Sequence, residues 1–77
     1  MLLCIDVGNT NITYGFYKDS ELYCTFRNDT KEIISLEDLE NNFLMGINNY
    51  NIHKNEIEFA IVCSVVPRID SLLTEMF

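Results

Sequence analysis

The sequence has few basic residues and few cysteines, and both shortages exclude classes of function. Five Lys and Arg stand against twelve Asp and Glu, for a net charge of −7. The five cations are scattered singly, and a surface of this sign repels phosphodiester backbones, so nucleic acid is not an expected partner. Three widely spaced cysteines, Cys4, Cys24 and Cys63, match neither a disulfide framework nor a zinc pattern. We expect reduced thiols buried in strands, as is usual for a cytoplasmic protein.

The sequence also lacks long apolar runs and a second histidine. No run approaches the roughly 20 residues of a membrane span, and Met1 to Ile5 is too short for a signal peptide and lacks its basic flank. We therefore expect a cytoplasmic protein without a membrane partner. The one histidine, His53, lies in a polar connection without a nucleophile or carboxylate pattern around it, which is typical of an exposed loop residue.

The length allows one domain at most. A domain of this size buries only about 60% of its unfolded surface, so its margin of stability is small. The final segment from Ile69 to Phe77 has the pattern of an amphipathic helix without a terminating cap or glycine. We expect the chain to be the N-terminal fragment of a longer protein.

The N-terminal segment carries the most information about chemistry. An apolar run ends on Asp6, and the four residues Gly8, Asn9, Thr10 and Asn11 lead into an alternating strand. Such a hairpin can bind phosphate, because Gly8 lets a ligand approach the backbone and the turn offers N–H, amide and hydroxyl donors. Asp6 beside it can hold a hydrated Mg²⁺. The same residue types also build hairpin turns that bind nothing, so the residues alone leave both interpretations open.

Hydrophobic periodicity predicts three strands followed by a helix. The first strand is apolar on both faces and is therefore expected to be central. Residues 12–17 and 22–27 alternate with period two, with Leu22, Cys24 and Phe26 on one face, and the polar turn 18–21 between them predicts an antiparallel meander. Ser35 and Asp38 have capping-box spacing before a helix whose apolar face contains Leu36, Leu39, Phe43, Leu44 and Ile47. Gly46 and the following asparagines are expected to weaken its end.

A fourth strand and a second helix follow. Residues 57–63 become apolar on both faces, which predicts a strand covered by helices on both sides. Because a helix crossover precedes it, this strand is expected to run parallel to the first. Pro67 fits the first position of the last helix. Its buried stripe is predicted to contain Ile69, Leu72, Leu73 and Met76.

Two segments resemble a known family. The run from Ile5 to Asn11 resembles the first phosphate motif of the acetate kinase, sugar kinase, Hsp70 and actin superfamily, and at the N-terminus it resembles the type III pantothenate kinases in particular. The run from Ile61 to Pro67 resembles that family's strand-to-helix segment, usually written with two serines before Val-Val-Pro, with Cys63 in place of the first. The pair is more specific than either motif alone. Members of the family are several times longer.

The resemblance implies a fold and a reaction. The fold is an α/β ribonuclease H-like (actin-like ATPase) half-domain, with residues 1–77 as the N-terminal part of the first nucleotide-binding domain and the second domain absent from this chain. The reaction is the ATP-dependent phosphorylation of pantothenate to 4'-phosphopantothenate, the first step of coenzyme A biosynthesis. The resemblance also implies a homodimer at full length.

The resemblance further assigns roles to individual residues. Asp6 is the carboxylate that supports Mg²⁺ through water. The ATP phosphates are bound by Asp6, Val7, Gly8, Asn9, Thr10, Asn11, Ile12 and Thr13. The general base, the pantothenate pocket and a site for a monovalent cation (K⁺ or NH₄⁺) follow residue 77 in the family, so we expect no catalytic residue in this chain and no activity from it alone.

Several alternatives remain open at this point. Ser64, after the last strand, is a candidate for lining a ligand cleft, but its hydroxyl is equally suited to bonding the start of the next helix. A ribonuclease H-like nuclease would use Asp6 as one of several clustered metal carboxylates. The chain also fits a non-catalytic regulatory homologue, or a kinase of the same superfamily that acts on a sugar or on acetate.

Overall fold

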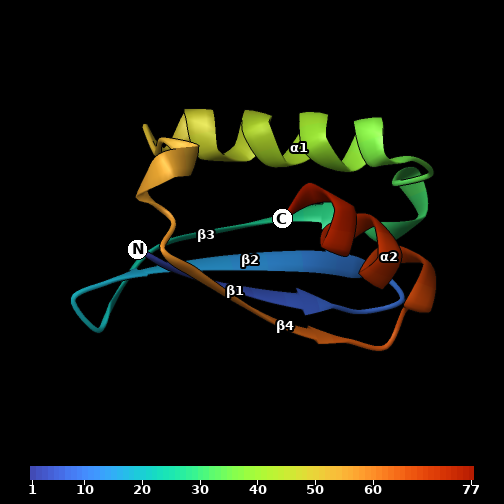
Figure 1. The fold of residues 1–77 in the computed structure, drawn as a ribbon, viewed down its shortest axis with the longest axis horizontal. Helices are drawn as coiled ribbons and strands as arrows, with labels where there is room; N and C mark the ends of the chain where they lie inside the picture. The colour runs from blue at the N-terminus through green and yellow to red at the C-terminus, as the bar shows by residue number, and fades with distance from the viewer.

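The fold is a four-stranded mixed sheet with both helices on the same face (Figure 1). The computed structural model describes all 77 residues. Neither helix reaches the length and hydropathy that a membrane-spanning helix requires. The elements in chain order are β1 (Leu2–Val7), β2 (Asn11–Lys18), β3 (Glu21–Asp29), the 3-10 turn η1 (Thr30–Glu32), α1 (Leu36–Asn49), the 3-10 turn η2 (Lys54–Glu56), β4 (Phe59–Ser64) and α2 (Pro67–Met76).

The sheet has the strand order β3-β2-β1-β4. β1, β2 and β3 pair antiparallel, and β4 pairs parallel to β1. The predicted meander, the central position of β1 and the parallel crossover are therefore confirmed. Asp19 and Ser20 close the β2–β3 turn with φ of 52° and 69°. Positive φ at two successive turn residues matches the right-handed twist of the flanking strands.

The core lies between the helices and one face of the sheet. Alternate residues of β1 and β2 point toward the helices, as the period of two requires. The helices contribute one stripe each, and Leu72 packs at the margin of the α2 stripe. The fully enclosed members of this core are Leu3, Ile5, Val7, Ile12, Tyr14, Phe16, Ile33, Leu39, Phe43, Ile47 and Ile69.

The opposite face of the sheet is open, and this corrects two predictions. β4 was expected to have helices on both sides, but α1 and α2 cover the same face and β4 lies at the sheet edge (Figure 1). Its apolar side chains Phe59, Ile61 and Val62 are exposed, and so is Cys63. Cys63 is therefore not a buried core thiol, whereas Cys24 is buried as predicted and Cys4 is half-buried. The apolar residues of β4 indicate a preference for burial, but two helices on the same face cover only one side of the sheet.

A β-bulge changes the faces of β3. The register shifts between Phe16 and Tyr17, so that Phe16 pairs with Cys24 and Tyr17 pairs with Leu22. One extra residue of β3 therefore lies between the two pairs. Leu22 emerges on the open face, 55% exposed, and does not share the face of Cys24 as simple alternation predicted.

Helix α1 begins at the predicted cap and continues beyond its predicted weak point. The Asp38 N–H donates to Ser35 Oγ at 3.2 Å, and the Ser35 N–H donates to Asp38 Oδ2 at 3.2 Å. Gly46 lies against the Phe26 ring, since a Cβ at this position would stand 2.1 Å from a ring carbon. The glycine thus allows the helix to approach β3 closely. Leu44, predicted to be on the buried face, is 39% exposed at its margin.

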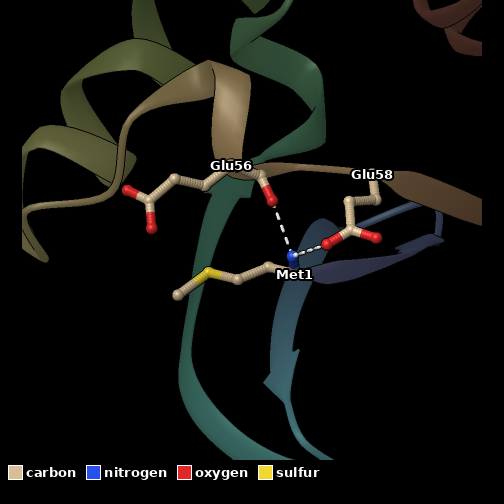
Figure 2. A network of polar contacts seen from close by, with 3 residues as sticks. All are labelled: Met1, Glu56 and Glu58. Atoms are coloured by element: carbon tan, nitrogen blue, oxygen red, sulfur yellow. Dashed lines mark hydrogen bonds and ion pairs between the residues drawn. The ribbon is translucent and has the colours of Figure 1, made fainter.

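The chain start is attached to the segment that precedes β4. Figure 2 shows the Met1 ammonium, which donates to the Glu56 carbonyl at 2.6 Å and lies 3.7 Å from Glu58 Oε1. The Glu58 N–H donates to the Met1 carbonyl at 2.9 Å. These contacts fix the parallel register of β1 and β4, in which Leu2 faces Phe59.

Candidate functional site

The predicted phosphate-binding turn is a tight hairpin between β1 and β2. The last strand pair is Val7 with Ile12, and the Gly8 N–H donates to the Asn11 carbonyl at 2.8 Å. Asn9 and Thr10 form the tip and are exposed. The turn therefore projects two polar residues from the end of the central strand into solvent.

The tip of the hairpin has hydrogen-bond donors without partners. The Gly8 N–H and the Thr10 carbonyl each form a backbone hydrogen bond. The N–H groups of Asn9 and Thr10, in contrast, have no hydrogen-bond partner in the chain. No side-chain hydrogen bond in the chain uses the Asn9 amide or the Thr10 hydroxyl. A turn that only reversed the chain would commonly use such side chains to bond its own backbone. These donors are available to an anion.

Gly8 is not required by the turn conformation. No glycine in the chain has a positive φ, so Gly8 adopts backbone angles that other residues tolerate. A Cβ at Gly8 would meet only the Asn11 carbonyl oxygen within 4 Å, at 3.4 Å. The hairpin would therefore accept a side chain here with little adjustment. What a side chain would block is the approach of a ligand to the backbone.

Asp6 lies on the open face one residue before the buried end of β1. Its strand neighbours are Thr13 on β2 and Cys63 on β4. The carboxylate is exposed, and it has no cationic partner because the one ion pair in the chain joins Met1 and Glu58. Asp6, Thr13 and Cys63 border a shallow hollow of about 330 Å³. Asp6 thus presents a free negative charge beside the hairpin.

This carboxylate fits a hydrated Mg²⁺ better than a protein-enclosed metal. The chain contains no group of three or more His, Cys, Asp or Glu side chains that could enclose an ion. Mg²⁺ commonly keeps several waters and binds through one or two carboxylates together with substrate phosphates. A single free carboxylate next to unpartnered phosphate donors has that composition.

The other predicted phosphate residues differ in what they can offer. The side chains of Val7 and Ile12 are enclosed in the core, 1% and 0% exposed, so only their backbone can reach a ligand. Asn11 and Thr13 are half-buried. Thr13 points to the open face with Asp6, because residues paired across a sheet share a face.

Ser64 follows the second of its two predicted alternatives, bonding the start of the next helix, and Cys63 lies beside Asp6. The Ser64 hydroxyl accepts from the Val66 N–H at 3.1 Å, so it bonds the backbone where α2 begins. Its side chain lies on the helix side of β4, together with Ala60 and Val62. Sequence reasoning did not include Cys63 in the site. The parallel register would have identified it, since Asp6 faces residue 63 and side chains alternate between faces.

Two residues missed by sequence reasoning hold the underside of the hairpin. Thr30, in η1, bonds Gly8 and Thr10, and Arg68, in α2, bonds Thr30. These two residues are recognised only by their hydrogen bonds to backbone carbonyls, and such bonds leave no pattern in the sequence. Elsewhere, burial raises the pKa of the Tyr14 hydroxyl and of the Cys24 thiol, both of which lie in the core away from the hairpin.

The largest hollow lies at the other end of the sheet. It measures about 580 Å³ and is bordered by Met1, Lys18 and three carboxylates, those of Asp19, Glu56 and Glu58. An excess of carboxylates disfavours an anionic ligand there. The hairpin end therefore remains the candidate site for phosphate.

Comparison with known proteins gives one consistent result. The family model described as type III pantothenate kinase matches residues 2–77. The type III pantothenate kinase of Sulfurihydrogenibium sp. (strain YO3AOP1) is 31% identical over 75 residues, covering 97% of this chain and 30% of that protein. That of Finegoldia magna is 35% identical over 69 residues, covering 90% of this chain and 26% of that protein.

A third relative also covers nearly the whole chain. The type III pantothenate kinase of Moorella thermoacetica is 38% identical over 79 aligned positions, covering 99% of this chain and 30% of that protein. The chain thus spans between 26% and 30% of the length of these curated relatives.

Proposed function

The chain belongs to the type III pantothenate kinase family, and we propose that its hairpin binds the phosphates of ATP in a full-length enzyme that phosphorylates pantothenate. The product is 4'-phosphopantothenate, the first intermediate toward coenzyme A. The observation that carries this proposal is the tip of the β1–β2 hairpin. There, the N–H groups of Asn9 and Thr10 have no partner, and Gly8 leaves the backbone accessible.

The residues act by positioning and by charge. The N–H groups and the Asn9 and Thr10 side chains donate to phosphate oxygens, which offsets the repulsion between ATP and a chain of net charge −7. Asp6 would hold a hydrated Mg²⁺ beside the same phosphates. When bound, Mg²⁺ neutralises charge that develops on the transferred phosphoryl group.

The transfer itself is an in-line displacement. The primary hydroxyl of pantothenate forms a bond to the γ-phosphorus, the bond to the β–γ bridging oxygen breaks, and ADP leaves. The hydroxyl proton goes to a base that we expect in the rest of the full-length protein. The hairpin contributes by holding the γ-phosphoryl group in line and spreading its charge over fixed donors.

The remaining proposals concern the whole protein. The mixed sheet with two helices is compatible with an actin-like ATPase half-domain, and we assign it to the ribonuclease H-like fold as the first part of a two-domain enzyme. We propose that the second domain supplies the pantothenate pocket and the site for K⁺ or NH₄⁺. We further propose a cytoplasmic homodimer, and the three free cysteines are in keeping with a reducing compartment.

The nuclease alternative has less support. A ribonuclease H-like nuclease needs carboxylates clustered around its metals, and the strand neighbours of Asp6 are a threonine and a cysteine. A sugar or acetate kinase is disfavoured by the family match. A non-catalytic homologue would share the hairpin and bind nucleotide without turnover, so the experiment must measure both.

The test is Asp6→Asn in the full-length protein. We expect pantothenate-dependent ADP release to fall by at least about 100-fold, because the variant loses the charge that holds the metal. The thermal unfolding midpoint should stay unchanged, since the carboxylate is exposed and unpaired. Asp19→Asn is the matched control: it makes the same change at the exposed turn at the other end of β2, where Asn tolerates φ of 52°.

The outcomes separate the alternatives. Loss of turnover in Asp6→Asn with normal turnover in Asp19→Asn supports the proposal. Normal turnover in both variants would show that Asp6 has no role in the reaction. A wild-type protein that binds MgATP in calorimetry but releases no ADP with pantothenate is a binding homologue.

A further inference from the structure

Thr30 is the one buried residue outside the hydrophobic core, and it lies directly beneath the candidate phosphate-binding turn. It is 2% exposed and follows β3 in the short turn η1. A buried polar group must be hydrogen-bonded, or it destabilises the fold. All of its hydrogen-bonding groups are used, and two of its bonds go to the hairpin.

Thr30 holds two carbonyl groups of the turn. Its Oγ1 donates to the Gly8 carbonyl at 2.8 Å, and its backbone N–H donates to the Thr10 carbonyl at 2.9 Å. These two residues flank Asn9. Thr30 therefore hydrogen-bonds the backbone on both sides of the hairpin tip.

The bond to the Gly8 carbonyl sets the direction of one of the donors at the tip, the Asn9 N–H. A trans peptide unit is planar, so its C=O and N–H point in opposite directions. The Gly8 carbonyl and the Asn9 N–H belong to one such unit. With the carbonyl directed down to Thr30, the Asn9 N–H is directed away from the fold, and the same constraint applies to the unit of Thr10 and Asn11.

Arg68 connects this support to the second family motif. Its guanidinium donates to the Thr30 carbonyl at 3.0 Å and also to the Ile33 carbonyl. Arg68 is the second residue of α2, directly after Pro67. The hairpin and the strand-to-helix segment are thus linked through Thr30, although Thr30 belongs to neither motif.

We propose that Thr30 is a positioning residue for nucleotide binding, which orients the Asn9 N–H toward the phosphates through its hydroxyl bond to the Gly8 carbonyl. Arg68 keeps Thr30 in place. This inference rests on the proposed function, since it concerns the same turn. It predicts a specific effect on ATP, because the peptide unit that Thr30 fixes carries a phosphate donor and no group that meets pantothenate.

The experiment compares Thr30→Val, Thr30→Ser and Thr74→Val in the full-length protein. Valine keeps the shape of threonine but removes the hydroxyl, whereas serine keeps it. We expect Thr30→Val to raise the KM for ATP about tenfold, the loss of roughly one hydrogen bond, with the KM for pantothenate unchanged. Thr30→Ser should restore the wild-type KM for ATP. Thr74→Val is the matched control, because it removes another hydroxyl bond, that of Thr74 to the Asp70 carbonyl.

A purely structural role gives a different result. In that case Thr30→Val lowers the unfolding temperature, while both KM values of the folded variant match those of Thr74→Val, and this would overturn the inference. If Thr30→Val does not fold, Arg68→Met decides, because Arg68 is exposed. A raised KM for ATP in that variant supports the inference, and an unchanged KM overturns it. A wild-type protein that neither binds nor hydrolyses ATP refutes the proposed function itself.

Discussion

Replacing Gly8 with alanine separates the two explanations for the hairpin. If the glycine serves only the turn, Gly8→Ala should destabilise the fold; if it serves a ligand, the fold should tolerate the change. The structure favours tolerance, because Gly8 has no positive φ and the new Cβ would meet one atom, the Asn11 carbonyl oxygen, at 3.4 Å. At an unstrained position, Gly to Ala stabilises by about 0.4 to 1 kcal/mol. We expect the free energy of unfolding to be unchanged or to rise by up to about 1 kcal/mol.

The expected effect on ATP binding is much larger. A Cβ at Gly8 would stand where a phosphate must approach to meet the unpartnered N–H groups of Asn9 and Thr10. A hydrogen bond to a charged group contributes about 1.5 to 3 kcal/mol, so the loss of both amounts to about 3 to 6 kcal/mol. With 1.4 kcal/mol for each tenfold change, affinity for MgATP should fall by about 10² to 10⁴.

The assay is isothermal titration of MgATP into the full-length protein, with urea unfolding of the same samples. Gly15→Ala is the control: Gly15 lies within β2, away from the hairpin tip, and its Cβ would make only ordinary contacts, the nearest at 3.6 Å to Tyr17. A folded Gly8→Ala protein whose affinity stays within about threefold of the wild type would refute the argument, because a change that small lies below even one lost hydrogen bond to a charged group.

Two further predictions concern the packing of the core. Gly46→Ala should lower the free energy of unfolding by about 1 to 2 kcal/mol in urea titration, because the Cβ clashes with Phe26 and overpacking outweighs the gain in helix propensity; a more stable variant would contradict the close approach of α1 to β3. Tyr14→Phe should leave stability unchanged or raise it by about 1 kcal/mol, since the buried Tyr14 hydroxyl has no partner and burial raises its pKa. Tyr50→Phe is its control, because that hydroxyl donates to the Thr25 carbonyl at 3.3 Å and its loss should destabilise slightly. A Tyr14→Phe protein less stable than Tyr50→Phe would show that the Tyr14 hydroxyl has a partner.

The order and direction of the strands could be predicted because their signals are local. The two-residue period of β2 and the polar turn after it predict an antiparallel pair whatever surrounds them. The capping box at Ser35 likewise depends on residues three apart. Confirmed features of this kind need no knowledge of the rest of the fold.

The faces of the sheet could not be predicted in the same way. The apolar sequence of β4 indicates a preference for burial, but which layer covers it depends on elements distant in the chain. The bulge in β3, opposite Phe16 and Tyr17, places Leu22 on the open face, and the alternation of polar and apolar residues in the sequence of β3 does not reveal it. Gly46 was interpreted as a weak helix position, because helix propensity is visible in a sequence and the Phe26 ring that it accommodates is not.

The candidate site, too, could be predicted only in part. Asp6, Gly8, Asn9 and Thr10 could be named from the sequence because the run that contains them resembles a known phosphate motif; their residue types alone also fit a turn that binds nothing. The direction of the Asn9 N–H could not be predicted, because an N–H direction is a property of the peptide plane and is set by the residue that binds the carbonyl of the same peptide unit. Here that residue is Thr30, 22 positions after Gly8. A motif therefore specifies which groups are available to a ligand, while residues outside the motif determine whether those groups point toward it.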